Sequence, residues 1–222
     1  MSSQKINHFE FLKKLIVGDE KIGGVLLIWG ESGSGKTSFM VRVCKDALKI
    51  GKKVLFFDVE GNIKPEDLAE MKKFDNFTYC LHITDINEIV RTIETDLKRD
   101  NYDLICFDSI GLAVMSTYVE EANKFQVFQR RANLMSLLTR YALLKGAIVI
   151  VSDQPTLEGE LGKGRYTYYA KEKWFFKKIS ASPTATIISV LVTTSRRFGA
   201  NTNLATIKID NSGVHIAWKV KV

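Results

Sequence analysis

The sequence predicts an α/β fold: a mainly parallel, twisted sheet flanked by helices, with antiparallel strands at the C-terminal end. Two observations predict this class. Short apolar runs without alternation, typical of strands buried on both faces, alternate with segments of helical period. After residue 151 the pattern changes, and β-rich runs follow one another without intervening helices. We find no linker or internal repeat, and therefore expect one domain over residues 1–222.

The individual elements follow from these patterns. The buried parallel strands are expected at residues 25–29, 54–57, 104–107 and 148–151. Amphipathic helices are expected at about 36–49, 65–73, 85–99 and 120–145. Residues 156–183 carry no clean period and predict a long loop. The antiparallel strands are expected at 185–194, 204–209 and 214–218.

Composition and charge narrow the class of protein. Apolar residues make up 45% of the chain and charged residues 26%, which excludes a disordered or collagen-like chain. No apolar stretch is long enough for a membrane span, no signal-peptide core is present, and three dispersed cysteines indicate reduced thiols, so we expect a cytoplasmic protein. The net charge of +7 comes from residues 160–222, with 11 Lys and Arg against 3 Asp and Glu. This asymmetry favours a polyanionic partner, nucleic acid first; the alternative is a solvated lysine-rich surface.

The strongest motif is a glycine-rich turn between the first strand and the first helix. Residues 30–37 match G-x-x-x-x-G-K-[ST] in full, and we call them the phosphate loop. Its backbone N–H groups and the following helix N-terminus suit ATP phosphates, with Lys36 reaching the β- and γ-phosphates and Thr37 a Mg²⁺ ligand. The expected nucleotide-binding residues are Gly30, Glu31, Ser32, Gly33, Ser34, Gly35, Lys36, Thr37 and Ser38.

Three polar residues follow other core strands. Asp108 ends a buried run and is expected to hold Mg²⁺ directly or through water; the alternative is an Asp that caps the next turn. Glu60 follows the second strand and is expected to orient or deprotonate the attacking water; the alternative is a surface Glu. Gln154 follows the last core strand and is expected to sense the γ-phosphate; the alternative is an ordinary loop Gln.

The order of these motifs resembles a known family. It is similar to the RecA-type ATPase core of archaeal and eukaryotic strand-exchange recombinases. The motifs that carry this resemblance are, in chain order, the phosphate loop, Glu60-Gly61 with Pro65-Glu66, Asp108-Ser109 and Gln154. The resemblance extends to their short paralogues, the RadA paralogues and RadB-like proteins. It implies a RecA-like P-loop NTPase core with a catalytic role for Glu60, metal binding by Asp108 and a sensor role for Gln154. Lys36, Glu60 and Gln154 form the expected catalytic set.

The resemblance also implies two DNA-binding loops, one after Asp108 and one after Gln154. Interleaved cations and aromatic rings suit single-stranded DNA, because cations follow phosphates and rings stack on bases. The alternatives are a buried element around Trp174 with ordinary surface lysines, and a polar helix face at residues 130–131. The candidate DNA-binding residues are Arg130, Arg131, Lys163, Arg165, Tyr166, Tyr168, Lys171, Lys173, Trp174, Lys177 and Lys178.

RecA-type sites often lie between subunits, with a cation supplied across the interface. Arg196 and Arg197 are candidates for such an arginine finger; the alternative is a basic hairpin turn. If the finger comes from another protein, the isolated chain should hydrolyse ATP slowly. No F-x-x-A motif, by which full recombinases polymerise, occurs, and we expect a monomer or low-order oligomer. In the family the position of Asp67 is usually Arg.

We therefore expect an ATP-hydrolysing recombinase paralogue that binds single-stranded DNA and assists or regulates homologous recombination and DNA repair. A full-length RadA-type recombinase or another paralogue is the expected protein partner. The alternatives are a KaiC-like regulatory ATPase without a DNA role and a binding module that uses ATP as a structural ligand.

Overall fold

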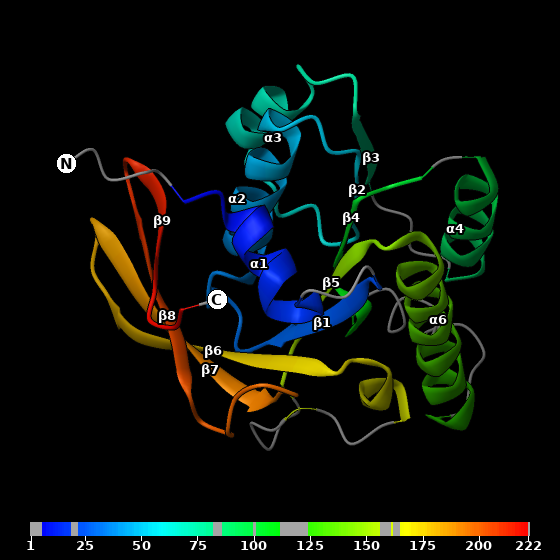
Figure 1. Ribbon diagram of the computed structural model, residues 1–222. Helices are drawn as coiled ribbons and strands as arrows, with labels where there is room; N and C mark the ends of the chain where they lie inside the picture. Colours follow the sequence, from blue (N-terminus) through cyan, green and yellow to red (C-terminus); the bar gives the residue numbers. More distant parts are fainter. Residues whose placement is uncertain are drawn as a thin grey trace.

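The computed structural model describes residues 6–18, 22–81, 86–99, 101–111, 124–155, 161 and 165–221. One nine-stranded sheet, in the order β3-β2-β4-β5-β1-β6-β7-β8-β9, crosses the molecule (Figure 1). The strands are β1 (Gly24–Trp29), β2 (Val54–Asp58), β3 (Phe77–Leu81), β4 (Leu104–Asp108), β5 (Ile148–Asp153), β6 (Glu172–Ala181), β7 (Ala185–Thr194), β8 (Asn203–Asp210) and β9 (Gly213–Trp218). The helices are α1 (His8–Val17), α2 (Lys36–Lys49), α3 (Pro65–Met71), α4 (Ile86–Arg99), α6 (Lys124–Lys145) and the 3₁₀ helix η1 (Arg165–Tyr169).

The sheet is parallel from β3 through to β6 and antiparallel from β6 to β9. This confirms the predicted fold class. The central strands carry apolar side chains on both faces because helices cover both faces, which is why their sequences show no alternation. No helix in the described part of the chain is long and apolar enough to cross a membrane.

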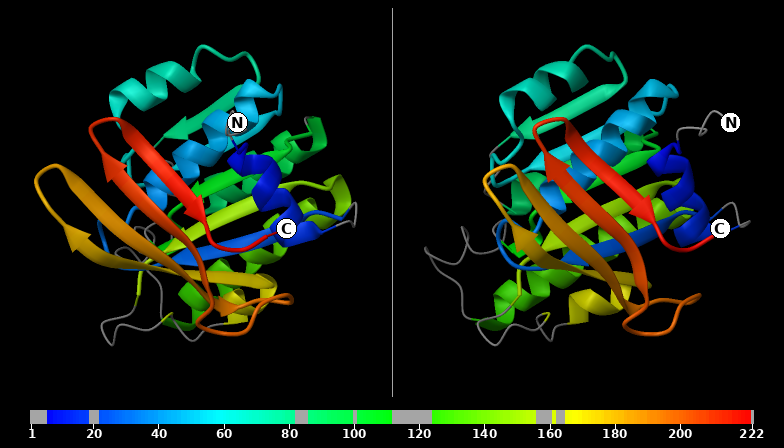
Figure 2. Two further views of the ribbon diagram at one scale, coloured as in Figure 1. Left: turned by 60° about the vertical axis from the view of Figure 1, so that its left-hand side comes forward. Right: turned by 90° about the vertical axis from the view of Figure 1, so that its left-hand side faces the viewer.

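Helices lie on both faces of the sheet (Figure 2), and an apolar layer lies between the sheet and the helices on each side. Side chains of α1, α2 and the β8–β9 strands pack on one face of the sheet, where Phe39, Trp174 and Ile207 are buried. Side chains of α4 and α6 pack on the other, where Ile93 and Leu138 are buried. The sheet is therefore fixed from both sides, and the carboxyl ends of β1, β2, β4 and β5 meet at one edge.

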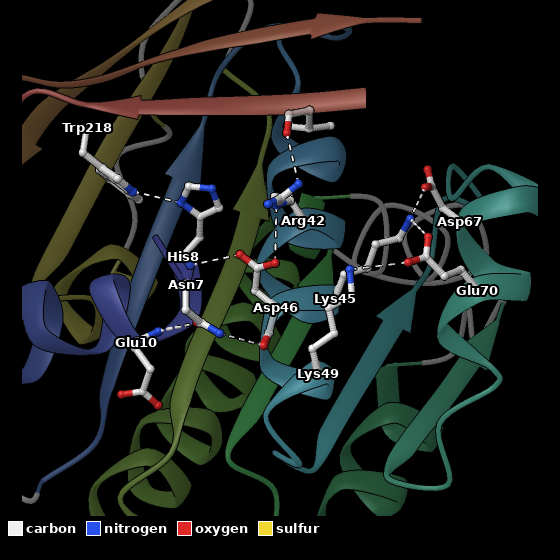
Figure 3. Close-up of polar contacts among 11 residues, drawn as sticks. Asn7, His8, Glu10, Arg42, Lys45, Asp46, Lys49, Asp67, Glu70 and Trp218 are labelled. Carbon is white, nitrogen blue, oxygen red and sulfur yellow. Dashed lines mark hydrogen bonds and ion pairs between the residues drawn. The ribbon is translucent and has the colours of Figure 1, made fainter. Parts of the chain in front are cut away.

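Helix α1 is anchored to α2 by polar contacts at its first turn (Figure 3). The side chain of Asn7 caps α1 by accepting the Glu10 N–H at 3.0 Å. The backbone N–H of His8 donates to Asp46 Oδ2 at 3.0 Å, and Trp218 Nε1 donates to His8 Nδ1 at 3.0 Å. These bonds tie the N-terminal helix to α2 and to the last strand.

Three elements differ from the sequence expectation. Neither α1 nor the edge strand β3 was expected. The predicted loop 156–183 is wrong over its second half, because β6 pairs with β1 on one side and β7 on the other. Residues 156–160 and 162–164 of that segment lie outside the described residues.

Candidate ATP site

The phosphate loop connects β1 to α2, as expected. Gly33 and Gly35 have φ angles of 70° and 81°, in the left-handed region that favours glycine. A Cβ on Gly35 would lie 2.5 Å from the side chain of Ile188, so the sheet packs closely against the loop here. Only glycine suits this position, and the close packing holds the loop's shape.

Lys36 lies at the first position of α2 and is buried. Its Nζ donates to the carbonyl oxygens of Gly30 at 2.6 Å and Glu31 at 2.9 Å. Burial lowers the pKa of Lys36, and the nearby carboxylates, Asp108 first and then Glu60, oppose this shift. The ammonium group therefore sits within the loop, among carbonyls that phosphate oxygens would replace as its acceptors.

Asp108 and Thr37 meet beside the loop. Thr37 Oγ1 donates to Asp108 Oδ2 at 2.5 Å, and Ser152 Oγ donates to Asp108 Oδ1. Burial raises the pKa of Asp108 to about 6, although both hydroxyl donors act against the shift. A buried carboxylate beside a hydroxyl is a set of hard oxygen ligands that fits Mg²⁺.

No group of three or more His, Cys, Asp or Glu side chains that could hold a metal is found among the described residues. Thr37 and Asp108 would thus supply only part of a Mg²⁺ coordination shell. Phosphate oxygens and water usually complete such shells in nucleotide sites.

The turn that carries Glu60 is fixed by Asp58, the last residue of β2. Its carboxylate accepts the backbone N–H groups of Asn62 at 3.1 Å and Ile63 at 3.3 Å. It also accepts the hydroxyl of Tyr79 at 3.0 Å, and burial raises the pKa of Tyr79. Asp58 therefore shapes the turn that positions Glu60.

Glu60 lines the same cavity as Lys36 and Asp108. Ser109 Oγ donates to Glu60 Oε1, and Asn62 Nδ2 donates to Glu60 Oε2 at 2.6 Å. The Glu60 carboxylate is close enough to Lys36 and Asp108 to shift the pKa of each upward. The structure thus brings together the three acidic and basic groups expected at the site.

Gln154 follows β5 at the same edge of the sheet, next to a buried polar cluster. Asp153 Oδ1 accepts the Gln154 N–H at 2.9 Å, and Asp153 Oδ2 accepts the Tyr166 hydroxyl at 2.8 Å. The guanidinium of Arg131 lies 5.5 Å from the Tyr166 ring centre, and Arg131 Nη2 donates to Gly111 O at 3.4 Å. Burial raises the pKa of Asp153, opposed first by Arg131. This cluster joins α6 and η1 to the end of β5.

A cavity of about 400 Å³ lies over the phosphate loop. Its lining comprises residues 32–38 of the loop and α2, with Glu60, Asn62, Asp108, Gln154, Thr186 and Ile209. A second cavity of about 680 Å³ shares Ser38 and Ile209 with the first and extends between α2, α3 and the β8–β9 turn. In its wall Lys45 Nζ donates to Asp67 Oδ1 at 2.6 Å and to Glu70 Oε2 at 2.5 Å (Figure 3). The two cavities thus adjoin at Ser38 and Ile209.

Two of the candidate DNA-binding residues need correction. Trp174 is fully buried and Tyr166 is 1% exposed, so neither ring is available to stack on a base. Trp174 is buried because the first half of β6 alternates, with Trp174 and Phe176 packed against Phe39 of α2. Tyr166 is buried because its hydroxyl pairs with Asp153.

The remaining candidates are separated by the structure. Tyr168 is 73% exposed, with Lys173 Nζ 6.0 Å from its ring centre and Lys171 exposed nearby. Lys177 and Lys178 are exposed farther along β6, about 13–17 Å from Lys173 at the usual rise per residue. Arg130 is half-buried on α6, Lys163 lies outside the described residues, and of Arg165 the structure describes only the backbone, at the start of η1.

The arginine-finger candidates lie at the opposite end of the strands from the phosphate loop. The Arg196 N–H donates to Glu172 Oε1 at 3.1 Å, at the start of β6. Arg197 Nη1 donates to the carbonyl of Lys14 at 3.0 Å, near the end of α1. Neither side chain reaches the site of its own chain, and Arg197 already has a structural partner.

The sequence reasoning missed the hydroxyl and amide groups that hold the site residues. Ser109 and Asn62 hold Glu60, Ser152 holds Asp108, and Asp153 holds the backbone of Gln154. A signal was available, since polar residues adjoin the ends of two buried strands, at Asp108-Ser109 and Ser152-Asp153.

Known proteins share this sequence pattern. A family model described as an AAA domain matches residues 22–213. The DNA repair and recombination protein RadB of Methanococcoides burtonii is 36% identical over 162 residues, which cover 69% of this chain and 71% of that protein. RadB of Methanosphaera stadtmanae is 27% identical over 152 residues, 64% of each chain, so the match spans less than two thirds of that relative.

Solved structures share the fold. The crystal structure of the RadB recombinase superposes with a TM-score of 0.68 at 21% identity, covering 91% of this chain and 94% of that one. A KaiC-like protein from Pyrococcus horikoshii superposes with a TM-score of 0.67 at 18% identity, covering 92% of this chain and 94% of that one. From the matched family model, the RadB relatives and this fold together, the chain belongs to the RecA-type ATPases as a RadB-like recombinase paralogue.

Proposed function

We propose that this protein binds ATP with Mg²⁺ in the cavity over the phosphate loop, hydrolyses it slowly, and binds single-stranded DNA to assist or regulate recombinational DNA repair. One observation supports the ATPase part above all others. One cavity of about 400 Å³ is lined by side chains from the ends of three different strands, namely Lys36, Thr37, Asp108 and Glu60. A binding module without turnover has no use for a carboxylate at the position of Glu60.

Each residue has a distinct role in this proposal. The phosphate loop N–H groups and Lys36 bind the β- and γ-phosphates, and Thr37 and Asp108 hold Mg²⁺, which neutralises charge on the phosphate oxygens. The Glu60 carboxylate accepts a proton from the attacking water. Its hydrogen bonds from Ser109 and Asn62 keep that carboxylate oriented. The Gln154 amide contacts the γ-phosphate from the end of β5.

The second cavity is the proposed place for the nucleoside. It shares Ser38 and Ile209 with the phosphate cavity and is lined by residues of α2, α3 and the β8–β9 turn. Asp67 stands where the family usually has Arg, and unlike Arg it cannot pack on a base. Its carboxylate is instead paired with Lys45. The base would therefore lie against aliphatic side chains and the β8–β9 turn.

Glu60→Gln tests the catalytic proposal, because it keeps the shape and removes the base. We expect the single-turnover rate of ATP hydrolysis to fall about 10²–10⁴-fold, with the affinity for ATPγS nearly unchanged. Glu88→Gln, on the exposed side of α4, is the matched control and should leave both unchanged. Equal hydrolysis rates for wild type and Glu60→Gln would remove Glu60 from the mechanism.

The proposal of DNA binding draws on the excess of cations in residues 160–222 and on the names of the RadB relatives. The exposed Tyr168 ring has Lys173 Nζ 6.0 Å from its centre, and Lys171 is exposed two residues before Lys173 in the chain. Fluorescence anisotropy with a single-stranded oligonucleotide should show affinity that falls steeply with salt. Tyr168→Ala combined with Lys171→Ala should weaken it.

A second candidate function is that of a regulatory ATPase without a DNA role. The burial of Trp174 and Tyr166 favours it, because it removes two of the rings expected to stack on bases. Absence of single-stranded DNA binding at low salt, together with intact ATP hydrolysis, would decide for this candidate.

A further inference from the structure

The β6–β7 hairpin runs directly beside the phosphate loop. Strand β6 is parallel to β1, with Phe175 opposite Trp29, so the next residues of β6 pass the start of the loop. A Cβ on Gly30 would lie 2.5 Å from the carbonyl oxygen of Phe176. The hairpin then extends to a tip at the left of the molecule (Figure 1). Thr186 of β7 lines the phosphate cavity. The hairpin is thus a wall of the site.

Lys178 is a cation of this hairpin that faces the loop. A Cβ on Gly33 would lie 3.7 Å from Lys178 Nζ. The register gives independent support: Lys178 pairs with Ile188, and it is Ile188 that packs against Gly35. Paired residues of an antiparallel ladder share a face, so Lys178 and Ile188 lie on the loop side of the hairpin.

Lys177 is the natural comparison. It carries the same charge, is also exposed, and pairs with Ser189. Because successive side chains of a strand alternate, Lys177 lies on the face away from the loop.

Lys178 also has no acidic partner among the residues that the structure describes. Among the described residues it makes neither an ion pair nor a side-chain hydrogen bond. Lys36 Nζ, in contrast, is held by two carbonyls of the loop. The ammonium group of Lys178 thus lies beside the phosphate loop at Gly33, without an ion-pair partner among the described residues.

We propose that Lys178 is a second phosphate-binding lysine, supplied by the same chain, that contacts the terminal phosphate of the bound nucleoside triphosphate. The inference rests on the proposed ATPase function. Under this inference Lys178 is no longer a candidate DNA-binding residue. The site then has a cation at the γ-phosphate from its own chain and needs no arginine from a neighbouring subunit for this contact. A hairpin cation placed there would stabilise charge that develops on the γ-phosphate during hydrolysis.

The experiment compares Lys178→Ala, Lys178→Arg and the control Lys177→Ala in the full chain. Calorimetry gives the affinities for ATPγS and ADP with Mg²⁺, and single-turnover assays give the hydrolysis rate. We expect Lys178→Ala to weaken ATPγS about tenfold, ADP less than about threefold, and to slow hydrolysis about tenfold or more. Lys178→Arg should restore most of the preference for the triphosphate, and Lys177→Ala should leave it unchanged.

Three results would overturn the inference, and they differ from failure of the proposed function. An unchanged ratio of ATPγS to ADP affinity in Lys178→Ala removes the contact with the terminal phosphate. Equal effects of Lys178→Ala and Lys177→Ala would show that the lost positive charge matters, and not a contact made by Lys178. If Lys178→Ala loses single-stranded DNA binding but binds nucleotides normally, Lys178 is a DNA-binding residue. A wild-type protein that binds no nucleotide would instead overturn the proposed function itself.

Discussion

Trp174→Ala is expected to destabilise the fold strongly. The indole is fully buried and packs edge-on against Phe39 and Trp218, with ring centres 6.4 Å and 6.2 Å away. Truncating a buried tryptophan costs about 3–5 kcal/mol, from lost burial and the cavity left behind. Total stabilities of single domains are about 5–15 kcal/mol, so this one change removes a large fraction.

Urea unfolding followed by circular dichroism measures this loss. Tyr168→Ala is the matched control, because its ring is 73% exposed and its loss should change stability by less than about 0.5 kcal/mol. If the alanine variant does not fold, Trp174→Phe keeps a ring in the site and should show a smaller loss of the same sign. A Trp174→Ala protein of wild-type stability with lost single-stranded DNA binding would refute the reasoning, because it would place the indole on a binding surface.

Two further predictions concern buried polar contacts. Tyr166→Phe removes the hydroxyl that donates to Asp153 and should cost about 1–3 kcal/mol in urea unfolding, since a buried carboxylate loses a donor; no measurable loss would contradict this. Burial lowers the pKa of His8, opposed by the charge of Asp46, so the unfolded chain binds the proton more readily and stability should fall as pH drops through about 6.5. His8→Gln should flatten this pH dependence by at most about 1.4 kcal/mol per pH unit, and an unchanged slope would show that another group causes it.

The sequence was sufficient for the centre of the fold and of the site. The unalternated runs that became β1, β2, β4 and β5 have one physical cause, burial on both faces of a parallel sheet. Because carboxyl ends of parallel strands share an edge, motifs distant in sequence had to meet there. The positions of Lys36, Glu60 and Asp108 follow from this rule alone.

The peripheral strands were harder to predict because their patterns are ambiguous. In β6 lysines and aromatic rings intermix, a pattern that also suits a nucleic-acid loop. The decisive feature is the alternation of Glu172, Trp174 and Phe176, which are buried, with Lys173 and Phe175, which are partly exposed. Strand pairing decides that alternation, and the residues of β6 alone do not reveal its partners.

The edge strand β3 and helix α1 were missed for different reasons. In β3 every side chain is partly or largely exposed, so it lacks the apolar signal of the central strands. Helix α1 had a usable signal, since Phe9, Leu12 and Leu15 recur at helical spacing behind the capping residue Asn7. The charged residues between them masked that period.

The most direct test of the whole account is calorimetric titration of Mg²⁺ and ATPγS into the wild-type protein and Lys36→Ala. The account predicts saturable binding by the wild type, and affinity about ten- to a hundredfold weaker once the ammonium group that faces the phosphates is lost. Equal affinity of the two proteins, with the variant still folded, would contradict it, because the triphosphate would then bind somewhere other than the loop between β1 and α2.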